Sequence, residues 1–312
     1  MSNLTTTVLI PTYRRTQDLK VCLEALKKQE ELPNELLIIV RDGDLETWEF
    51  IDTFDSKPLP LKTIKVIEPG ILVALTAGFN SATGDIIAIT DDDAAPHPDW
   101  LSQIKAYYLS DSRIGGVGGR DFLYEDKTHL VEGSQQLVGR VLWFGNVVGN
   151  HHLGVGEARE VDVLKGVNSS YRRVALKDFC FDQQLRISGK NTHNELAICL
   201  DLKKAGWKLI YDPKIAVDHY PGKRIAMADR KKFDAVAFRD TAYNQTLILM
   251  KYFPPYQQLI FMIWAVLVGT RDRRGLIQCL RFFLKEGMIS VKKFLAAFKG
   301  RWQGWQDGQK SI

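Results

Sequence analysis

The sequence predicts an α/β protein, with a mostly parallel sheet flanked by helices and a helical, basic C-terminal extension. In the first half, short runs of β-branched residues alternate with helical periodicity, which is typical of β-α units. The composition, 45% hydrophobic and 25% charged, is that of a folded chain and excludes disordered, collagen-like and coiled-coil classes. Because the pattern becomes helical beyond residue 222, we expect one domain over residues 1–222 and a second region over 223–312.

Three β-α units are expected before residue 91. Strands are predicted where short apolar runs are bounded by turn-forming residues, over 7–10, 35–40, 63–67 and 85–90. A first helix is predicted by apolar residues that share one helix face, namely Leu19, Cys22, Leu23 and Leu26, and a later helix over 72–81. Residues 121–160 have no clear period and predict loops or irregular hairpins.

Regular structure is expected again in the second half. The pattern predicts an ordered segment over 161–165, a helix over 192–205 and strands over 208–211 and 215–217. Beyond these, helices are predicted whose ends are marked by glycines. Residues 223–312 hold 17 Lys and Arg against 6 Asp and Glu. A basic extension can bind anionic lipid, nucleic acid or an acidic partner, and its charge alone does not choose among them.

Several classes of site are not indicated. The four cysteines are widely spaced and include no C-x-x-C pair, so they suggest neither a zinc site nor a disulfide framework, and a reducing compartment is expected. The first residues lack the pattern of a signal peptide, which predicts a cytoplasmic location. Neither G-x-G-x-x-G after the first strand nor G-x-x-x-x-G-K-[ST] is present, which argues against a dehydrogenase and a P-loop ATPase.

The strongest functional feature is the run Asp91-Asp92-Asp93, at the carboxyl end of the strand predicted over 85–90. Open α/β sheets bind their ligands at this edge. Adjacent carboxylates repel each other, and a divalent cation such as Mg²⁺ or Mn²⁺ would keep them ionised. The alternative is an acidic turn that caps the next helix, although one aspartate would be enough for a cap.

Glu195 has two interpretations. Thr192 and Glu195 match the S/T-x-x-E capping box, in which the glutamate only accepts a backbone N–H at the start of a helix. Glu195 could instead be a catalytic carboxylate, and a helix N-terminus favours its ionised form in both cases.

His219 and Asp42 are further candidates. His219 follows the strand predicted over 215–217, and imidazole is an acceptable ligand for Mn²⁺-like ions, although a lone histidine is more often packed or solvated. Asp42 follows the strand predicted over 35–40. It is either a turn residue beside Gly43 or a hydrogen-bond acceptor for a nucleobase.

In combination, these motifs resemble the family 2 glycosyltransferases. In the first half, the resemblance rests on Val8-Leu9-Ile10-Pro11-Thr12-Tyr13, on Arg41-Asp42-Gly43-Asp44, on the run from Gly84 to Asp93 and on Pro98-Asp99-Trp100-Leu101. In the second half, Gly166 to Arg173 is similar to the acceptor-side segment G-x-N-x-x-x-R-R, and Glu195 to His219 is similar to the catalytic helix, strand and following histidine. The resemblance covers about residues 5–222.

The resemblance implies a Rossmann-like GT-A fold, a nucleotide-diphospho-sugar donor, a divalent metal and inversion at the anomeric carbon. It implies that the donor is bound by Pro11, Thr12, Tyr13, Asp42, Asp91, Asp92 and Asn168. Asp93, Asp91 and His219 would bind the metal, and Glu195 would be the general base. The chain departs from the family pattern at Arg41-Asp42-Gly43-Asp44, where Asp-Asp-Gly-Ser is usual, and at Asn194-Glu195, where two acids are usual.

We therefore expect an inverting, metal-dependent glycosyltransferase of polysaccharide biosynthesis, acting on a glycan or lipid-linked hydroxyl acceptor. The metal would neutralise the leaving nucleoside diphosphate, and Glu195 would deprotonate the acceptor. The alternative is a non-catalytic nucleotide-sugar-binding or assembly protein, in which Glu195 only caps its helix. Nucleic acid is not expected as a partner, because the extension is rich in aromatic and aliphatic residues and has no RNA-binding signature.

The extension predicts an anionic membrane surface as a partner. Residues 252–270 are uncharged and 259–268 are continuously apolar, which is too short for a span of about 20 residues. A monotopic or re-entrant segment at the cytoplasmic face is expected, with a buried helix as the alternative. Basic residues interleaved with apolar ones follow, a combination that suits headgroups. They are Arg271, Arg273, Arg274, Arg281, Lys285, Lys292, Lys293, Lys299 and Arg301.

Overall fold

The computed structural model describes residues 4–188, 192–221 and 233–310. The chain forms two compact units. The first comprises Met1–Arg140, Val148–Cys180 and Cys199–Ile225, and the second comprises Val141–Val147, Phe181–Ile198 and Ala226–Ile312. The boundary predicted at residues 222 and 223 lies outside the described residues. Two internal segments, 141–147 and 181–198, group with the C-terminal helices rather than with the sheet.

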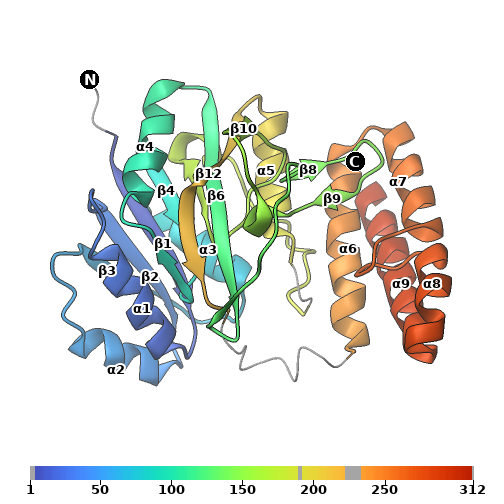
Figure 1. Ribbon diagram of the computed structural model, residues 1–312, viewed down its shortest axis with the longest axis horizontal. Coiled ribbons are helices and arrows are strands. Elements are labelled where there is room, and N and C mark those ends of the chain that lie inside the picture. The colour runs from blue at the N-terminus through green and yellow to red at the C-terminus, as the bar shows by residue number, and fades with distance from the viewer. Residues whose placement is uncertain (1–3, 189–191, 222–232, 311–312) are drawn as a thin grey trace. The chain divides into compact units, whose positions relative to one another are not determined.

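The first unit is built on a mostly parallel sheet that has ten strands within the described residues (Figure 1). Its order is β10-β12-β6-β11-β4-β1-β2-β3, with β5 paired to β12 and β7 paired to β6. The strands are β1 (Thr6–Thr12), β2 (Glu35–Arg41), β3 (Leu61–Val66), β4 (Ile86–Ile89), β5 (Ala94–Pro96), β6 (Ile114–Glu125), β7 (His129–Leu130), β10 (Arg159–Glu160), β11 (Ser169–Arg172) and β12 (Lys208–His219). A separate two-stranded sheet pairs β8 (Arg140–Val141) with β9 (Val147–Val148).

Helices connect and flank these strands. They are α1 (Thr16–Leu26), α2 (Leu45–Thr53), α3 (Ile71–Ser81), α4 (Trp100–Ser110) and α5 (Asn194–Lys204), with the 3₁₀ turns η1 (His151–Leu153) and η2 (Arg173–Leu176). The four strands and the two helices predicted before residue 91 are confirmed. The sequence analysis missed α2, whose N-cap is Asp44: the Asp44 carboxylate accepts the backbone N–H of Thr47.

Both faces of the central strands are buried, because helices cover the sheet on each side. Val8 and Ile10 of β1 pack in one cluster with apolar residues of α1 and α4. The alternate residue Leu9 points to the opposite face, where it lies against α3. A side chain at Gly78 of α3 would collide with Leu9, so this glycine allows the helix to approach the strand closely.

Three expectations about the chain from residue 121 onward need correction. Residues 161–165, expected to be an ordered segment, lie outside the named helices and strands. The strand β6 runs to Glu125 and so extends into the segment over 121–160, for which loops or irregular hairpins were expected. The two strands predicted over 208–211 and 215–217 are one continuous strand, β12, with a register shift between Asp212 and Ala216. The polar residues between the two apolar runs therefore mark a β-bulge within one strand rather than the end of a strand.

The second unit contains the predicted helices of the extension: α6 (Ala235–Tyr252), α7 (Pro255–Leu267), α8 (Leu276–Glu286) and α9 (Met288–Lys310), coloured orange to red in Figure 1. The glycines of α9 do not mark helix ends. Gly300, Gly304 and Gly308 lie inside the helix on the face that meets α6, and a Cβ at Gly304 would lie 2.6 Å from the carbonyl oxygen of Tyr243. Glycine therefore sets the close contact of these two helices.

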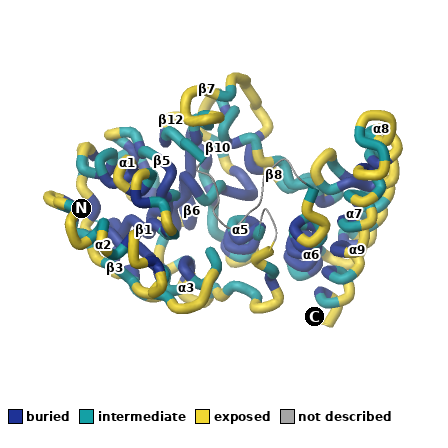
Figure 2. The backbone as a smooth tube through the Cα atoms, turned by 90° about the horizontal axis from the view of Figure 1, so that it is seen from below, coloured by how far each residue is buried: buried dark blue, intermediate teal, exposed yellow. Residues whose placement is uncertain are grey.

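Two arginines of the extension are interior residues. Arg274 is 1% exposed and donates to Glu286 Oε1 at 2.6 Å, and Arg301 is 2% exposed and donates to the carbonyl oxygen of Arg273 at 2.6 Å. The prediction that both face a membrane is wrong, because their guanidinium groups bind acceptors within the unit. Exposed residues instead line α8, as Figure 2 shows in yellow. No helix in the described part of the chain has both the length and the apolar character needed to cross a membrane.

Candidate functional site

The candidate site lies at one edge of the sheet of the first unit. Strands β1 and β4 are parallel, as are β6 and β12, and β11 is antiparallel to both β4 and β6. All four strands therefore run in the same direction and end at the same edge. This edge is where open α/β sheets bind ligands, and it collects Thr12, the three aspartates, Asp121 and His219.

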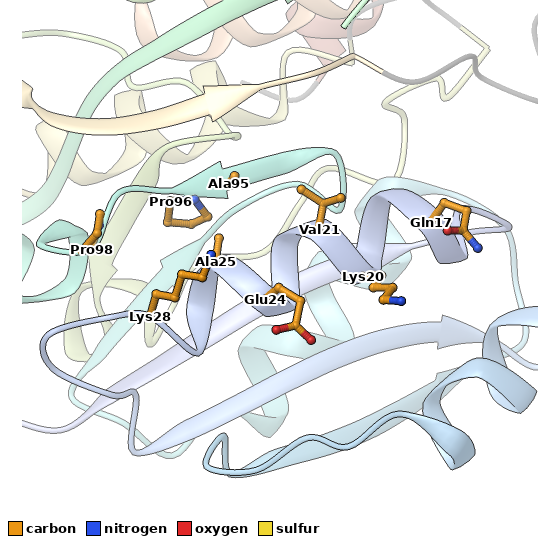
Figure 3. Close-up of a pocket in the computed structure, with 9 residues that line it drawn as sticks. All are labelled: Gln17, Lys20, Val21, Glu24, Ala25, Lys28, Ala95, Pro96 and Pro98. Atoms are coloured by element: carbon orange, nitrogen blue, oxygen red, sulfur yellow. The ribbon is translucent and has the colours of Figure 1, made fainter.

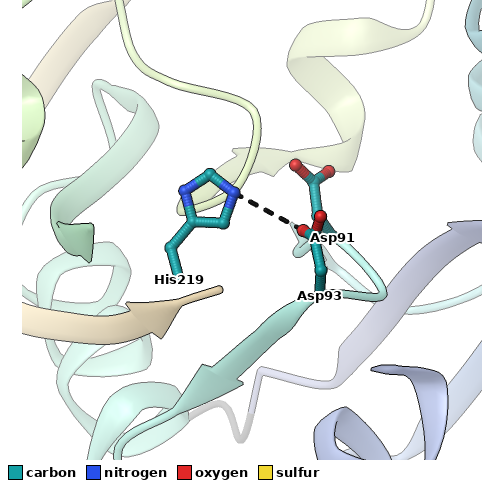
Figure 4. A group of neighbouring side chains, drawn as sticks. All are labelled: Asp91, Asp93 and His219. Atoms are coloured by element: carbon teal, nitrogen blue, oxygen red, sulfur yellow. Dashed lines mark ion pairs between the residues drawn. The ribbon is translucent and has the colours of Figure 1, made fainter. Parts of the chain in front are cut away.

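Two of the aspartates and the histidine form one cluster (Figure 4). One ligand atom from each of Asp91, Asp93 and His219 lies within 4.8 Å of the others. His219 Nε2 is 3.4 Å from Asp93 Oδ1. The backbone fixes this approach, because β5 pairs Ala94 with His219 and the N–H of Tyr220 donates to the carbonyl oxygen of Asp93 at 2.8 Å.

The middle aspartate points in another direction. Asp92 is 3% exposed and accepts from the hydroxyl of Thr12 and from Arg15 Nη1, each at 2.8 Å. Arg15 Nη1 also lies 3.0 Å from Asp93 Oδ2. Burial, the largest cause, raises the pKa of Asp92 to about 6, although the charge of Arg15 opposes this rise. Arg15 thus ties the acidic run to the start of α1, a role that the sequence analysis did not predict.

His219 is held from its other side by Asp121. Asp121 Oδ2 accepts from His219 Nδ1 at 3.3 Å and also forms an ion pair with Lys165. Burial by itself lowers the pKa of His219, but the hydrogen bonds to Asp121 and Asp93 outweigh it and raise the pKa to about 9. The sequence analysis missed Asp121 and Lys165. The available signal was an acid at the end of an apolar, glycine-rich strand, the same signal that singled out Asp42.

The residues predicted to contact the nucleotide base lie at the ends of β1 and β2, which are adjacent parallel strands. Pro11 and Thr12 end β1, and Tyr13 follows it. The guanidinium carbons of Arg14 and Arg41 lie 5.2 and 5.6 Å from the Tyr13 ring centroid. Asp42 is exposed and pairs with Lys65 at 3.0 Å. These side chains share one edge with the acidic cluster.

Asn168, which was predicted to bind the donor, lies at the junction of β6 and β12. Its side chain is fully buried and accepts from Trp100 Nε1 at 2.9 Å. Its amide group donates to the carbonyl oxygens of Arg120 at 3.1 Å and Ile215 at 2.9 Å. These bonds join β6 to β12 just before Asp121 and beside the register shift. They account for an asparagine here without a contact to a sugar.

Glu195 lies in the first turn of α5 and is half-buried. It belongs to the second unit, whereas α5 enters the first unit from Cys199 onward. The helix begins at Asn194, the preceding His193 has a φ of 57°, and the hydroxyl of Thr192 donates to Asn194 Oδ1 at 2.6 Å. His193, and not Thr192, therefore precedes the helix, which differs from the register of the capping box.

A groove elsewhere on the first unit is not part of this site. It runs along the outer face of α1 against β5 (Figure 3). It is lined by Gln17, Lys20, Val21, Glu24, Ala25, Lys28, Ala95, Pro96 and Pro98. None of the predicted site residues contributes to it.

Known proteins resemble the chain in sequence and in fold. The family model described as "Glycosyl transferase family 2" matches residues 7–179, more than half of the 312 residues. A glucosyl-dolichyl phosphate glucuronosyltransferase of Haloferax volcanii is 26% identical over 251 residues, which are 74% of this chain and 72% of that protein.

Two solved structures share the fold. The mannosyltransferase PcManGT from Pyrobaculum calidifontis, in complex with GDP-Man and Mn²⁺, aligns with a TM-score of 0.55 and 15% identity over 97% of this chain and 88% of that one. GalNAc-T7 with UDP, GalNAc and Mn²⁺ aligns with a TM-score of 0.61 and 16% identity over 99% of this chain and 56% of that one. The mostly parallel sheet ending in an acidic cluster is thus the GT-A fold, and the chain belongs to glycosyl transferase family 2 and is a glycosyltransferase.

Proposed function

We propose that the protein transfers a sugar from a nucleotide-diphospho-sugar to a hydroxyl acceptor with inversion, using a divalent cation. The observation that carries the proposal is the cluster of Asp91, Asp93 and His219, whose ligand atoms lie within 4.8 Å of one another. Carboxylate oxygens suit Mg²⁺ and Mn²⁺, and the imidazole favours Mn²⁺ of the two. The Mn²⁺ and nucleotide in the two solved structures support this assignment.

The residues around the cluster would divide the work. A cation held by Asp91, Asp93 and His219 would neutralise the charge that develops on the departing diphosphate. Arg15 holds Asp92 and Asp93 in place. Pro11, Thr12, Tyr13 and Asp42 would contact the base and Asp91 the ribose, because they lie at the same edge of the sheet.

Glu195 is proposed as the general base. Glu195 lies in the first turn of α5, where the helix N-terminus favours a negative charge, and a carboxylate there can accept the proton of the acceptor hydroxyl. Attack on the face of the anomeric carbon opposite the leaving diphosphate inverts its configuration. The support for this role is the position of Glu195 in the family motif, together with its partial exposure.

We further propose that the acceptor is lipid-linked and that the protein binds the anionic, cytoplasmic face of a membrane. The relative named as a glucosyl-dolichyl phosphate glucuronosyltransferase supports a lipid-linked acceptor. The exposed apolar residues of α8, among them Leu280 and Leu284, lie beside the exposed Arg281 and Lys285. Apolar and basic groups on one helix suit an anionic interface.

The test is release of nucleoside diphosphate from a panel of nucleotide sugars, with Mn²⁺ or Mg²⁺ and with a chelator. Asp93→Ala should abolish metal-dependent turnover while circular dichroism stays unchanged, because no neutral group replaces a carboxylate on a hard cation. The control is Asp178→Ala, which removes an exposed aspartate outside the cluster and should leave turnover unchanged. Full activity of Asp93→Ala, or full activity in the chelator, would exclude the metal site.

A further inference from the structure

Asp121 is a buried carboxylate that the proposed chemistry does not use directly. It lies near the end of β6, is 0% exposed, and pairs in register with Val217, two residues before His219. Because β6 and β12 are neighbours, the Asp121 carboxylate lies next to the His219 ring. It does not belong to the group of Asp91, Asp93 and His219 whose ligand atoms converge.

The contacts of Asp121 determine which nitrogen of the His219 imidazole is available to bind a cation. Its Oδ2 atom lies 3.3 Å from His219 Nδ1. An ionised carboxylate only accepts hydrogen bonds, so Nδ1 must carry the proton of this bond. The other ring nitrogen, Nε2, is directed to Asp93 Oδ1 at 3.4 Å. The ring is therefore oriented with Nε2, the nitrogen that would bind a cation, toward the cluster.

Lys165 holds the carboxylate in this orientation. Its ammonium group forms an ion pair with the same Oδ2 atom that accepts from His219. The other oxygen, Oδ1, is buried and has no hydrogen-bond partner among the described residues. A buried carboxylate oxygen without a partner destabilises a fold. Oδ1 therefore does not hold the carboxylate in place, and its position depends on the contacts of Oδ2 with Lys165 and His219.

The backbone around Asp121 and His219 is also held in place. The side chain of Asn168 donates to the carbonyl oxygen of Arg120, the neighbour of Asp121, and to that of Ile215 on β12. These bonds fix β6 against β12 at the register shift that precedes His219. Asn168, Asp121 and Lys165 thus form a support under the histidine.

We propose that Asp121 is a positioning residue that fixes the His219 ring, with Nε2 toward Asp91 and Asp93, and thereby sets the affinity of the cluster for a divalent cation. The inference rests on the metal site of the proposed function. Carboxylates that hydrogen-bond to a ligating histidine typically change metal affinity by about 10- to 100-fold when they are removed.

The experiment measures Mn²⁺ binding without turnover. The wild-type chain and Asp121→Asn are titrated with Mn²⁺ while free Mn²⁺ is followed by electron paramagnetic resonance. Pulsed measurements on the bound ion then detect coupling to a coordinated nitrogen. Asp121→Asn should weaken binding by about 10- to 100-fold and reduce the nitrogen coupling, because the ring is no longer held.

The matched control is Asp162→Asn. Asp162 is also a poorly exposed aspartate paired with a lysine, Lys203, but it is not part of the support. It should bind Mn²⁺ with wild-type affinity and coupling. If Asp121→Asn does not fold, Asp121→Ser replaces it, because the smaller side chain fits the site and also lacks the carboxylate.

The outcomes separate the two proposals. Absence of Mn²⁺ binding by the wild type would contradict the metal site itself. Wild-type binding without nitrogen coupling would show that His219 is not a ligand and would overturn the role of Asp121. Equal affinity and equal coupling in wild type and Asp121→Asn would overturn that role while leaving the metal site intact.

Discussion

The three consecutive aspartates have three different environments, although nothing in their sequence distinguishes them. Asp91 and Asp93 converge with His219, whereas Asp92 turns toward Thr12 and Arg15. The sequence was sufficient to place an acidic cluster at a sheet edge, because it follows a buried strand. It was not sufficient to assign the supporting partners, since Arg15, Asp121 and Lys165 come together only through strand order and side-chain direction.

Substitution of Glu195 tests its role as the base. Glu195→Gln keeps a side chain of the same size in the first turn of α5, so donor affinity and fold should be retained. Turnover should fall by about 10²- to 10⁴-fold, the usual contribution of a general base. Steady-state kinetics would show this as a loss in kcat with little change in the donor KM.

A second carboxylate on the same helix is the control for Glu195. Asp201→Asn also replaces an acid of α5 by its amide and should leave turnover near the wild-type value. A loss of less than about fivefold in Glu195→Gln would place the base on another residue.

Buried His151 makes the stability of the first unit sensitive to acid. The ring is 4% exposed, its Nε2 lies 2.9 Å from the carbonyl oxygen of Val163, and burial lowers its pKa to about 4. An unfolded histidine has a pKa of about 6.5. Between these values the unfolded chain binds a proton that the folded chain does not. The stabilisation is therefore complete above about pH 6.5 and is lost as the pH falls toward 4, by about 3 kcal/mol at most.

Urea unfolding at neutral and mildly acidic pH checks this dependence. His151→Phe removes the titrating group but keeps a ring against Tyr211. The variant should be less stable at neutral pH, because it lacks the hydrogen bond, and its stability should change less with pH. An unchanged pH dependence would mean that other groups cause the acid sensitivity.

At the scale of whole elements, the helices and strands that were predicted correctly are those determined by the local pattern of apolar residues. The strands β1 to β4 and the helices α1 and α3 follow from apolar runs and spacing. In contrast, α2 was missed because few of its residues are buried, so it has no strong apolar face. Residues 161–165 were expected to be regular, but their three apolar residues, Val161, Val163 and Leu164, are buried by tertiary packing outside any strand.

The contact of α6 with α9 depends on the glycines of α9. A Cβ at Gly300 would collide with the carbonyl oxygen of Arg239, which belongs to the backbone of α6 and cannot move independently. Overpacking usually destabilises a protein by about 1–3 kcal/mol, and the better helix propensity of alanine offsets about 1 kcal/mol of this. Gly300→Ala should therefore destabilise the second unit by up to about 2 kcal/mol. Thermal unfolding measures the difference.

The neighbouring exposed residue provides the comparison for Gly300. Lys299→Ala lies on the same helix and removes no buried contact, so its unfolding temperature should match the wild type. If Gly300→Ala is as stable as Lys299→Ala, the two helices can separate without loss, and the glycines do not determine their packing.

At the scale of the whole molecule, the basic charge of the extension has two uses that the sequence did not separate. Arg274 and Arg301 are buried and hold α8, α9 and the loop before α8 together. Arg281, Lys285, Lys292 and Lys299 remain exposed. The net charge counted from the sequence therefore overestimates the positive charge on the surface of the extension, because a buried arginine cannot contact a partner.

The exposed face of α8 carries the membrane proposal. Leu276, Ile277, Leu280, Phe283 and Leu284 recur with the spacing of one helix face, and all are more than 40% exposed, with Leu284 at 98%. Soluble surfaces rarely leave such a continuous apolar face uncovered. Burying two leucine side chains in an interface contributes about 3–6 kcal/mol, and each nearby Lys or Arg adds on the order of 1 kcal/mol on an anionic surface.

We expect the wild-type protein to sediment with anionic phosphatidylglycerol vesicles at low salt and less so at high salt, because ions screen the basic contacts. Leu280→Ser with Leu284→Ser should weaken binding at least tenfold at both salt concentrations, since it removes apolar insertion. Arg281→Gln with Lys285→Gln should mainly reduce the dependence on salt. The control is Leu45→Ser with Ile67→Ser, which alters two equally exposed apolar residues of the first unit, at 76% and 77% exposure, and should bind like the wild type. If the α8 double variant sediments as strongly as this control, or the wild type does not sediment, α8 does not bind the membrane and its apolar face must be covered by another surface.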